Sequence, residues 1–124
     1  MDNTKKSELI SRLKNNYISF QRSLSGVSRA KLIKMAGRIA AVDEAYTMLT
    51  KHYEWPEEEL DFFLLFRDPL TIVSDALENR NNEMGDNFED AMFDVAYSDK
   101  IMSEYPLIDG ADVNLYGKIM PFHD

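Results

Sequence analysis

The chain contains no cysteine, and this absence removes several classes of site together. Disulfide bonds, thiolate-bound zinc and a cysteine nucleophile are all excluded. A chain without cysteine also agrees with a reducing compartment. We therefore expect a cytoplasmic protein.

Long apolar runs are missing as well. The longest one, Phe-Phe-Leu-Leu-Phe at residues 62–66, falls far short of the roughly 20 residues that cross a bilayer. The first residues enter a polar, amphipathic stretch rather than the apolar core of a signal peptide. We expect neither secretion nor a membrane partner.

Charge is distributed unevenly along the chain. The net charge is −8, but residues 1–38 alone carry nine basic and two acidic side chains, which gives +7. Residues 39–124 carry five basic and twenty acidic side chains, which gives −15. Such asymmetry points to an electrostatic partner, and the simplest partner is the other half of the same chain.

The length of 124 residues and the hydrophobic fraction of 44% suit one packed domain. No internal repeat and no linker divides the chain. We therefore treat residues 1–124 as a single domain with three parts. These are a basic helical pair (1–54), a set of acidic helices (55–105) and a docked tail (106–124).

Apolar residues recur at spacings of three and four through the first part, which predicts two helices. Thr4 or Ser7 is expected to cap the first, and residues 25–26, Ser-Gly, to end it. Ser28 should cap the second, which is expected to run for about seven turns to Tyr53. A short turn predicts an antiparallel or angled pair.

Cap and proline signals predict three more helices. Trp55-Pro56 and Asp68-Pro69 each read as a helix start, and Asp86 with Glu89 has capping-box spacing. Tyr105-Pro106 should end the last helix, before a tail that is extended or folded as a small hairpin. The sequence predicts an all-α, compact bundle of about five helices.

One short segment has a possible DNA-binding pattern. Residues 25–30, Ser-Gly-Val-Ser-Arg-Ala, resemble the turn and recognition-helix start of bacterial helix-turn-helix repressors. The basic residues that would then meet a major groove are Arg29, Lys31, Lys34 and Arg38. Against this, Gln21 and Arg22 stand where those repressors need packing residues, and the acidic remainder would repel DNA. Nucleic acid is therefore not the partner we expect.

Acidic residues form a second pattern. Asp86, Asp90 and Asp94 lie four residues apart, where like charges destabilise a helix by about 0.2–0.5 kcal/mol per pair. We call these three residues the acidic ridge. One interpretation is a face that is solvated or paired with the basic first helices. The other is a surface that binds a partner or mimics nucleic-acid phosphates.

The apolar run at residues 62–66 forms a third pattern, because it surrounds a short helix on all sides. Either this helix is buried on both sides, or part of it is an exposed patch for a partner or a second subunit. In the second case, Phe62 and Phe66 are the candidate partner-binding residues, and at least one should be exposed in the free monomer.

We find no catalytic, cofactor-binding or metal-binding pattern. His52 and His123 have no second ligand at a diagnostic spacing, and we expect His52 at the surface near a helix end. Asp109, Asp112 and Asn114 lack the twelve-residue calcium-loop pattern. We therefore expect no enzyme and no cofactor.

From Lys31 to about Ala96 the order of signals resembles an uncharacterised family of small helical proteins. This family is found in gut-dwelling Firmicutes and their mobile elements. The residues that carry the resemblance are Leu32, Ile33 and Ala36, Leu64 and Leu65, Pro69 and Leu70, and Met84. It implies a helical fold and an accessory or mobile-element context, with no site residues to transfer.

Together, these patterns predict a non-enzymatic accessory or regulatory protein that binds another protein or a second copy of itself, as in a homodimer. The alternative is a helix-turn-helix-like DNA-binding regulator that uses the basic helix after Ser28.

Overall fold

The computed structural model describes residues 3–80, 88, 92, 95 and 99–109. These residues form six α-helices and one π-helical turn, η1, with no strand. The elements are α1 (Asn3–Ser23), α2 (Arg29–Lys34), α3 (Ala36–Thr47), η1 (Met48–His52), α4 (Glu57–Phe63), α5 (Pro69–Arg80) and α7 (Asp99–Glu104). The predicted all-α fold is confirmed.

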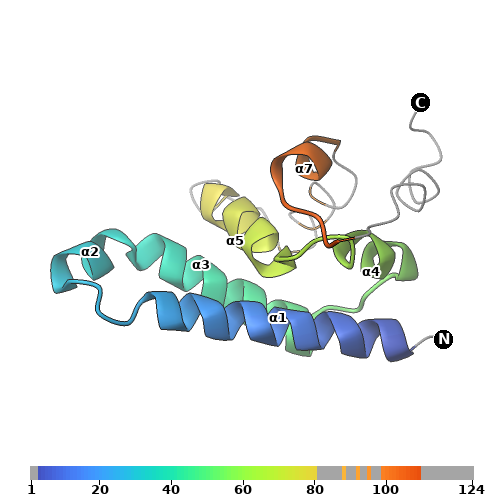
Figure 1. The fold of residues 1–124 in the computed structure, drawn as a ribbon, viewed down its shortest axis with the longest axis horizontal. Helices are drawn as coiled ribbons and strands as arrows, with labels where there is room; N and C mark the ends of the chain where they lie inside the picture. Colours follow the sequence, from blue (N-terminus) through green and yellow to red (C-terminus); the bar gives the residue numbers. More distant parts are fainter. Residues whose placement is uncertain (1–2, 81–87, 89–91, 93–94, 96–98, 110–124) are drawn as a thin grey trace.

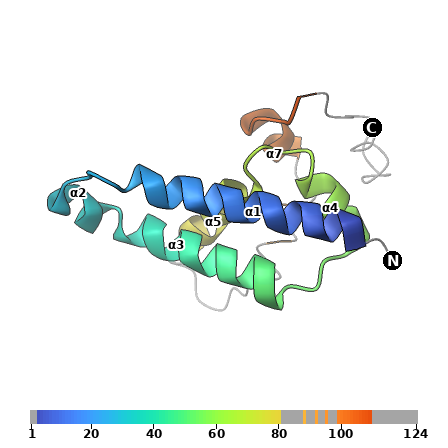
Figure 2. The same cartoon turned by 60° about the horizontal axis from the view of Figure 1, so that its bottom comes forward.

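The long helix α1 runs along the molecule, and α3 lies beside it in the opposite direction (Figure 1). Figure 2 shows α2 at one end of this pair. Other elements cover one side of α1 and α3, but they do not extend as far as α2. The covering elements are α4 and α5, and α7 lies beyond them (Figure 1). The predicted antiparallel pair is confirmed, and the core lies between the two layers.

Helix α1 begins at Asn3. Thr4 and Ser7 therefore lie inside the helix, and the prediction that one of them caps it was wrong. Its end is as predicted, because Gly26 adopts a φ of 81°, a conformation that is cheap only for glycine. The side chain of Ser28 then accepts a hydrogen bond from the backbone nitrogen of Lys31 at 3.2 Å. This is the predicted N-cap of α2.

The single second helix of seven turns was wrong. Met35, with φ −90° and ψ 4°, interrupts the helix and separates α2 from α3. The direction of α3 is set by its packing on α5 and α1, whereas α2 has no buried residue. A one-residue interruption leaves the apolar spacing unchanged, so the sequence pattern does not reveal it.

The small buried residues of α3 explain its close packing on α5. Ala41 and Ala45 are fully buried, and Val42 is nearly so. Short side chains let helix axes approach closely, so dispersion contacts form along the whole pair. Helix α3 then widens into η1, where the backbone nitrogen of Tyr53 bonds to the carbonyl of Met48, five residues back, at 2.8 Å.

The two proline signals mark helix starts. Pro56 is the N-cap of α4 and lies one residue before the position expected for it. Asp68 caps α5, because its carboxylate accepts hydrogen bonds from the Thr71 nitrogen at 2.9 Å and the Thr71 hydroxyl at 2.8 Å. An acceptor at this place satisfies a backbone donor that the helix leaves free.

Side chains of α1 bind the backbone of the turn between α4 and α5. The guanidinium of Arg12 donates to the carbonyls of Leu64 at 2.7 Å and Phe66 at 2.9 Å. One helical turn later, Asn16 donates to the carbonyl of Arg67 at 3.2 Å. Carbonyls at the end of a helix need such donors, so α1 fixes the course of the turn.

The chain returns to this turn after α7. Helix α7 ends at Glu104, which agrees with the end predicted at residues 105–106. The following residues cross the α4–α5 turn, where Leu107 and Phe66 form an isolated antiparallel bridge. Of the tail predicted at residues 106–124, residues 107–109 lie against this turn, and residues 110–124 lie outside the described part.

The predicted fifth helix is only partly described. Phe88, Met92 and Val95 are helical, and Met92 and Val95 are buried in the core as the pattern predicted. Ala96 and the cap predicted at Asp86 lie outside the described residues. No helix in the described part is long and apolar enough to cross a membrane.

Candidate functional site

The most unusual exposed surface lies on α2, at the end of the α1–α3 pair (Figures 1 and 2). We call it the α2 surface, and it consists of Arg29, Lys31, Ile33 and Lys34. All four side chains are exposed. Ile33 is 69% exposed and is the one exposed large hydrophobic residue in the described part of the chain. Exposed apolar groups that stand among charges are typical of interaction surfaces.

The three cations of the α2 surface have no carboxylate partner among the described residues. Arg29, Lys31 and Lys34 form no ion pair there, although carboxylates bind other cations of the basic segment. Arg22 is also exposed, and it lies in the last turn of α1. The α2 surface therefore presents positive charge that no carboxylate of the described residues neutralises.

Arg38, predicted as the fourth nucleic-acid contact, lies elsewhere. It is on α3, and it forms ion pairs with Asp75 and with Glu78, the latter at 3.1 Å. The hydroxyl of Tyr105 donates to the other oxygen of Asp75. Burial, and then the hydrogen bond to Asp75, raise the pKa of Tyr105 well above its usual value. Arg38 therefore stabilises the fold and is not free to contact phosphates.

Phe62 and Phe66 are fully buried, so the prediction that one of them is an exposed anchor was wrong. Their rings pack edge to face, with centroids 5.2 Å apart, and Phe62 packs in the same way on Phe63 at 5.3 Å. Phe62 lies on α4, which packs on α1 and ends at Phe63, while Phe66 lies in the following turn and pairs with Leu107. The apolar side of α4 is therefore covered, and its exposed residues are Glu57 and Glu58.

Asp86, Asp90 and Asp94 lie outside the described residues, so the acidic ridge stays a prediction. Of the calcium-like group, Asp109 is exposed and binds Arg67 at 2.7 Å, while Asp112 and Asn114 are not described. His52 is exposed at the end of η1, as expected. Within the described residues, no three His, Asp or Glu side chains are grouped closely enough to hold a metal ion.

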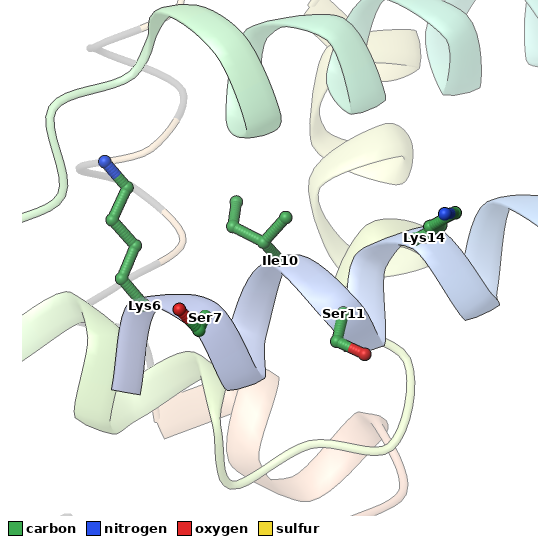
Figure 3. A pocket seen from close by; sticks show the side chains of 5 residues that line it. All are labelled: Lys6, Ser7, Ile10, Ser11 and Lys14. Atoms are coloured by element: carbon green, nitrogen blue, oxygen red, sulfur yellow. The ribbon is translucent and has the colours of Figure 1, made fainter. Parts of the chain in front are cut away.

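The sequence analysis missed a groove of about 500 Å³ along α1. Figure 3 shows that all its described lining residues project from this helix. They are Lys6, Ser7, Ile10, Ser11 and Lys14. None of these five residues is buried, so none of them supplies the enclosed polar group that would bind a specific small ligand. The sequence shows that these residues recur at helical spacing. It does not show which other segments border the groove.

A buried carboxylate was also missed. Glu59 is 7% exposed and accepts a hydrogen bond from the hydroxyl of Tyr53. Burial is the main cause that raises the pKa of Glu59, since it disfavours the charged form. The indole of Trp55 lies edge to face with Tyr53, at 5.0 Å, and donates to the Leu49 carbonyl at 3.0 Å. Residues 57–59 are three consecutive glutamates at a helix start, and the sequence does not indicate which of them is buried.

Comparisons of the chain with known protein families, with curated proteins and with solved structures found no match.

Proposed function

We propose that this protein is a non-enzymatic accessory protein that binds an acidic partner protein through the α2 surface. The observation that carries the proposal is the exposure of Ile33 between cations that have no carboxylate partner in the described part. An aliphatic side chain placed among positive charges suits a partner with an apolar contact and surrounding carboxylates.

Energetics support a protein partner in particular. Burying an isoleucine side chain stabilises an interface by about 1.5–3 kcal/mol, whereas exposed ion pairs add only about 0–1 kcal/mol each. Ile33 would therefore supply most of the affinity, and Arg29, Lys31 and Lys34 would select an acidic surface.

The alternative is a DNA-binding regulator, and one observation favours it. A glycine turn followed by a Ser28-capped basic helix is the arrangement of a helix-turn-helix reader. However, Arg38 is bound to Asp75 and Glu78, which leaves three predicted contacts rather than four. The net charge of −15 over residues 39–124 would also oppose a duplex.

Fluorescence anisotropy with two labelled probes tests both functions. One probe is an acidic amphipathic peptide of leucine and glutamate, and the other is a short duplex DNA. We expect the peptide to bind, and Ile33→Asn to weaken this binding by about tenfold, because an apolar contact worth about 1.4 kcal/mol is lost. A variant with Arg29, Lys31 and Lys34 changed to glutamine should also bind the peptide more weakly, because its ion pairs with the glutamates are lost.

The matched control is Lys6→Gln with Lys14→Gln, which removes positive charge from α1 but leaves the α2 surface intact. This variant should keep peptide binding. Duplex binding that exceeds peptide binding and falls steeply with salt would support the regulator instead. If neither probe binds, or if Ile33→Asn binds the peptide as the wild type does, the proposed α2 interface is wrong.

A further inference from the structure

Residues 105–109, which we call the strap, lie across the α4–α5 turn like a short bound peptide. The backbone nitrogen of Arg67 donates to the carbonyl of Pro106 at 3.1 Å. In return, the nitrogen of Ile108 donates to the carbonyl of Leu65 at 2.8 Å. These are the hydrogen bonds of an antiparallel pair centred on Phe66 and Leu107.

Arg67 adds a side-chain clamp to this pairing. Its Nε donates to the carbonyl of Leu107 at 2.9 Å, and its Nη2 binds the carboxylate of Asp109 at 2.7 Å. The guanidinium therefore binds both a backbone carbonyl and an acidic side chain two residues later. A planar group with several fixed donors is well suited to such recognition.

The receiving segment does not need the strap for its own shape. Arg12 holds the carbonyls of Leu64 and Phe66, while the strap uses the groups of Leu65 and Arg67. The Arg67 carbonyl is held from the same side, because the Asn16 side chain donates to it at 3.2 Å. Side chains of α1 therefore fix this turn from one side and leave the Leu65 carbonyl and the Arg67 nitrogen for the strap.

The strap is anchored at Tyr105, whose hydroxyl donates to Asp75, but residues 106–109 are held mainly at the surface. Pro106 is exposed, Leu107 and Ile108 are only half-buried, and the side chain of Asp109 is 97% exposed. The side chain of Arg67 is 58% exposed, so its clamp works at the surface. Exposed contacts of this kind exchange with solvent at small cost, and a competing strand would meet the same donors and acceptors.

We propose that the strap occupies a binding site for an extended peptide of another protein and acts as its built-in competitor. The peptide has two apolar residues followed by a carboxylate, which is the pattern that Leu107, Ile108 and Asp109 supply. It adds as a strand to residues 65–67, and Arg67 binds its carboxylate. This site is separate from the α2 surface and does not depend on it.

Competition by the chain itself sets the expected affinities. A tethered strap acts at an effective concentration on the order of millimolar, so a free peptide binds the wild type poorly. Weakening the strap exposes the site. Leu107→Asp removes an apolar contact and should tighten peptide binding by about tenfold. Asp109→Ala removes one exposed ion pair and should tighten it by up to about fivefold.

Fluorescence anisotropy of the full chain with a labelled peptide of the sequence of residues 104–109 tests this inference. Binding should rise from the wild type to Asp109→Ala and then to Leu107→Asp. Adding Arg67→Met to either strap variant should abolish it, and a peptide with lysine in place of its aspartate should not bind. Circular dichroism confirms that each variant is folded, and Asp109→Ala keeps the test valid if Leu107→Asp unfolds.

Ile33→Asn is the control that separates this site from the α2 surface, and it should leave binding of the strap peptide unchanged. The inference is overturned if folded strap variants bind the peptide no more tightly than the wild type. It is equally overturned if binding persists in Arg67→Met.

Discussion

At the scale of single residues, Glu59 shows how position alters chemistry. It lies in the first turn of α4 beside exposed Glu57 and Glu58, yet its own side chain is turned into the protein. The hydroxyl of Tyr53 donates to it and favours the charged form, but burial outweighs this bond and raises the pKa. A carboxyl group of this kind makes stability depend on pH.

The direction of this dependence follows from the raised pKa. In the folded protein Glu59 keeps its proton to a higher pH than in the unfolded chain, so stability falls as pH rises through the folded-state pKa. We expect Glu59→Gln to remove this component, because glutamine does not ionise and can still accept from Tyr53. Urea unfolding of both proteins between about pH 4 and pH 8 measures it.

The control is Glu44→Gln, an exposed carboxylate of α3, which should follow the wild type at every pH. A constant difference in unfolding free energy between wild type and Glu59→Gln across this range would contradict the prediction.

At the scale of elements, hydrogen bonds from side chains of α1 hold the turn between α4 and α5. Arg12 is 18% exposed at its side chain and binds two backbone carbonyls, together with Glu8 of its own helix at 3.1 Å. It joins segments that are more than 50 residues apart in the sequence. This connection also fixes the turn on which the strap lies.

We expect Arg12→Ala to lower the free energy of unfolding by about 1.5–3 kcal/mol, because partly buried carbonyls lose a charged donor. Arg12→Lys should recover only part of this, since an ammonium lacks the planar fork that reaches two acceptors. Chemical denaturation measures both variants. Lys14→Ala, exposed on the same helix, is the control, and a loss there equal to that of Arg12→Ala would argue against a specific role of the turn contact.

At the scale of the whole molecule, opposite charges connect the two parts of the chain. Lys5 binds Asp61 at 2.8 Å and lies 3.6 Å from Glu57, and Arg38 binds Asp75 and Glu78. Each exposed pair contributes little, but the pairs join the +7 segment to the −15 segment. Their sum is open to screening by salt.

The thermal midpoint should therefore fall as sodium chloride is raised to about 0.5 M, where the screening length is only a few ångströms. Differential scanning calorimetry measures this shift. A variant with Lys5→Gln and Arg38→Gln should begin with a lower midpoint and respond less to salt. A wild-type midpoint that stays constant or rises would show that these pairs do not govern the stability of the fold.

Local chemistry explains which features could be predicted from the sequence. Helix starts at Ser28 and Asp68 depend on a side chain and a backbone donor three residues away, so they are visible in any short window. The end of α1 at Ser23 is followed by Gly26, whose positive φ depends on the conformational freedom of glycine alone. The helical class follows from the apolar spacing in the same way.

The break at Met35, the complete burial of Phe62 and Phe66 and the commitment of Arg38 to α5 were decided by the tertiary structure. So were the exposure of Ile33 and the seating of residues 107–109 on the α4–α5 turn. Each of these depends on which segments, distant in sequence, pack against one another. An apolar run or a basic residue has the same pattern whether its neighbours cover it or leave it exposed, because burial and pairing are properties of the whole fold.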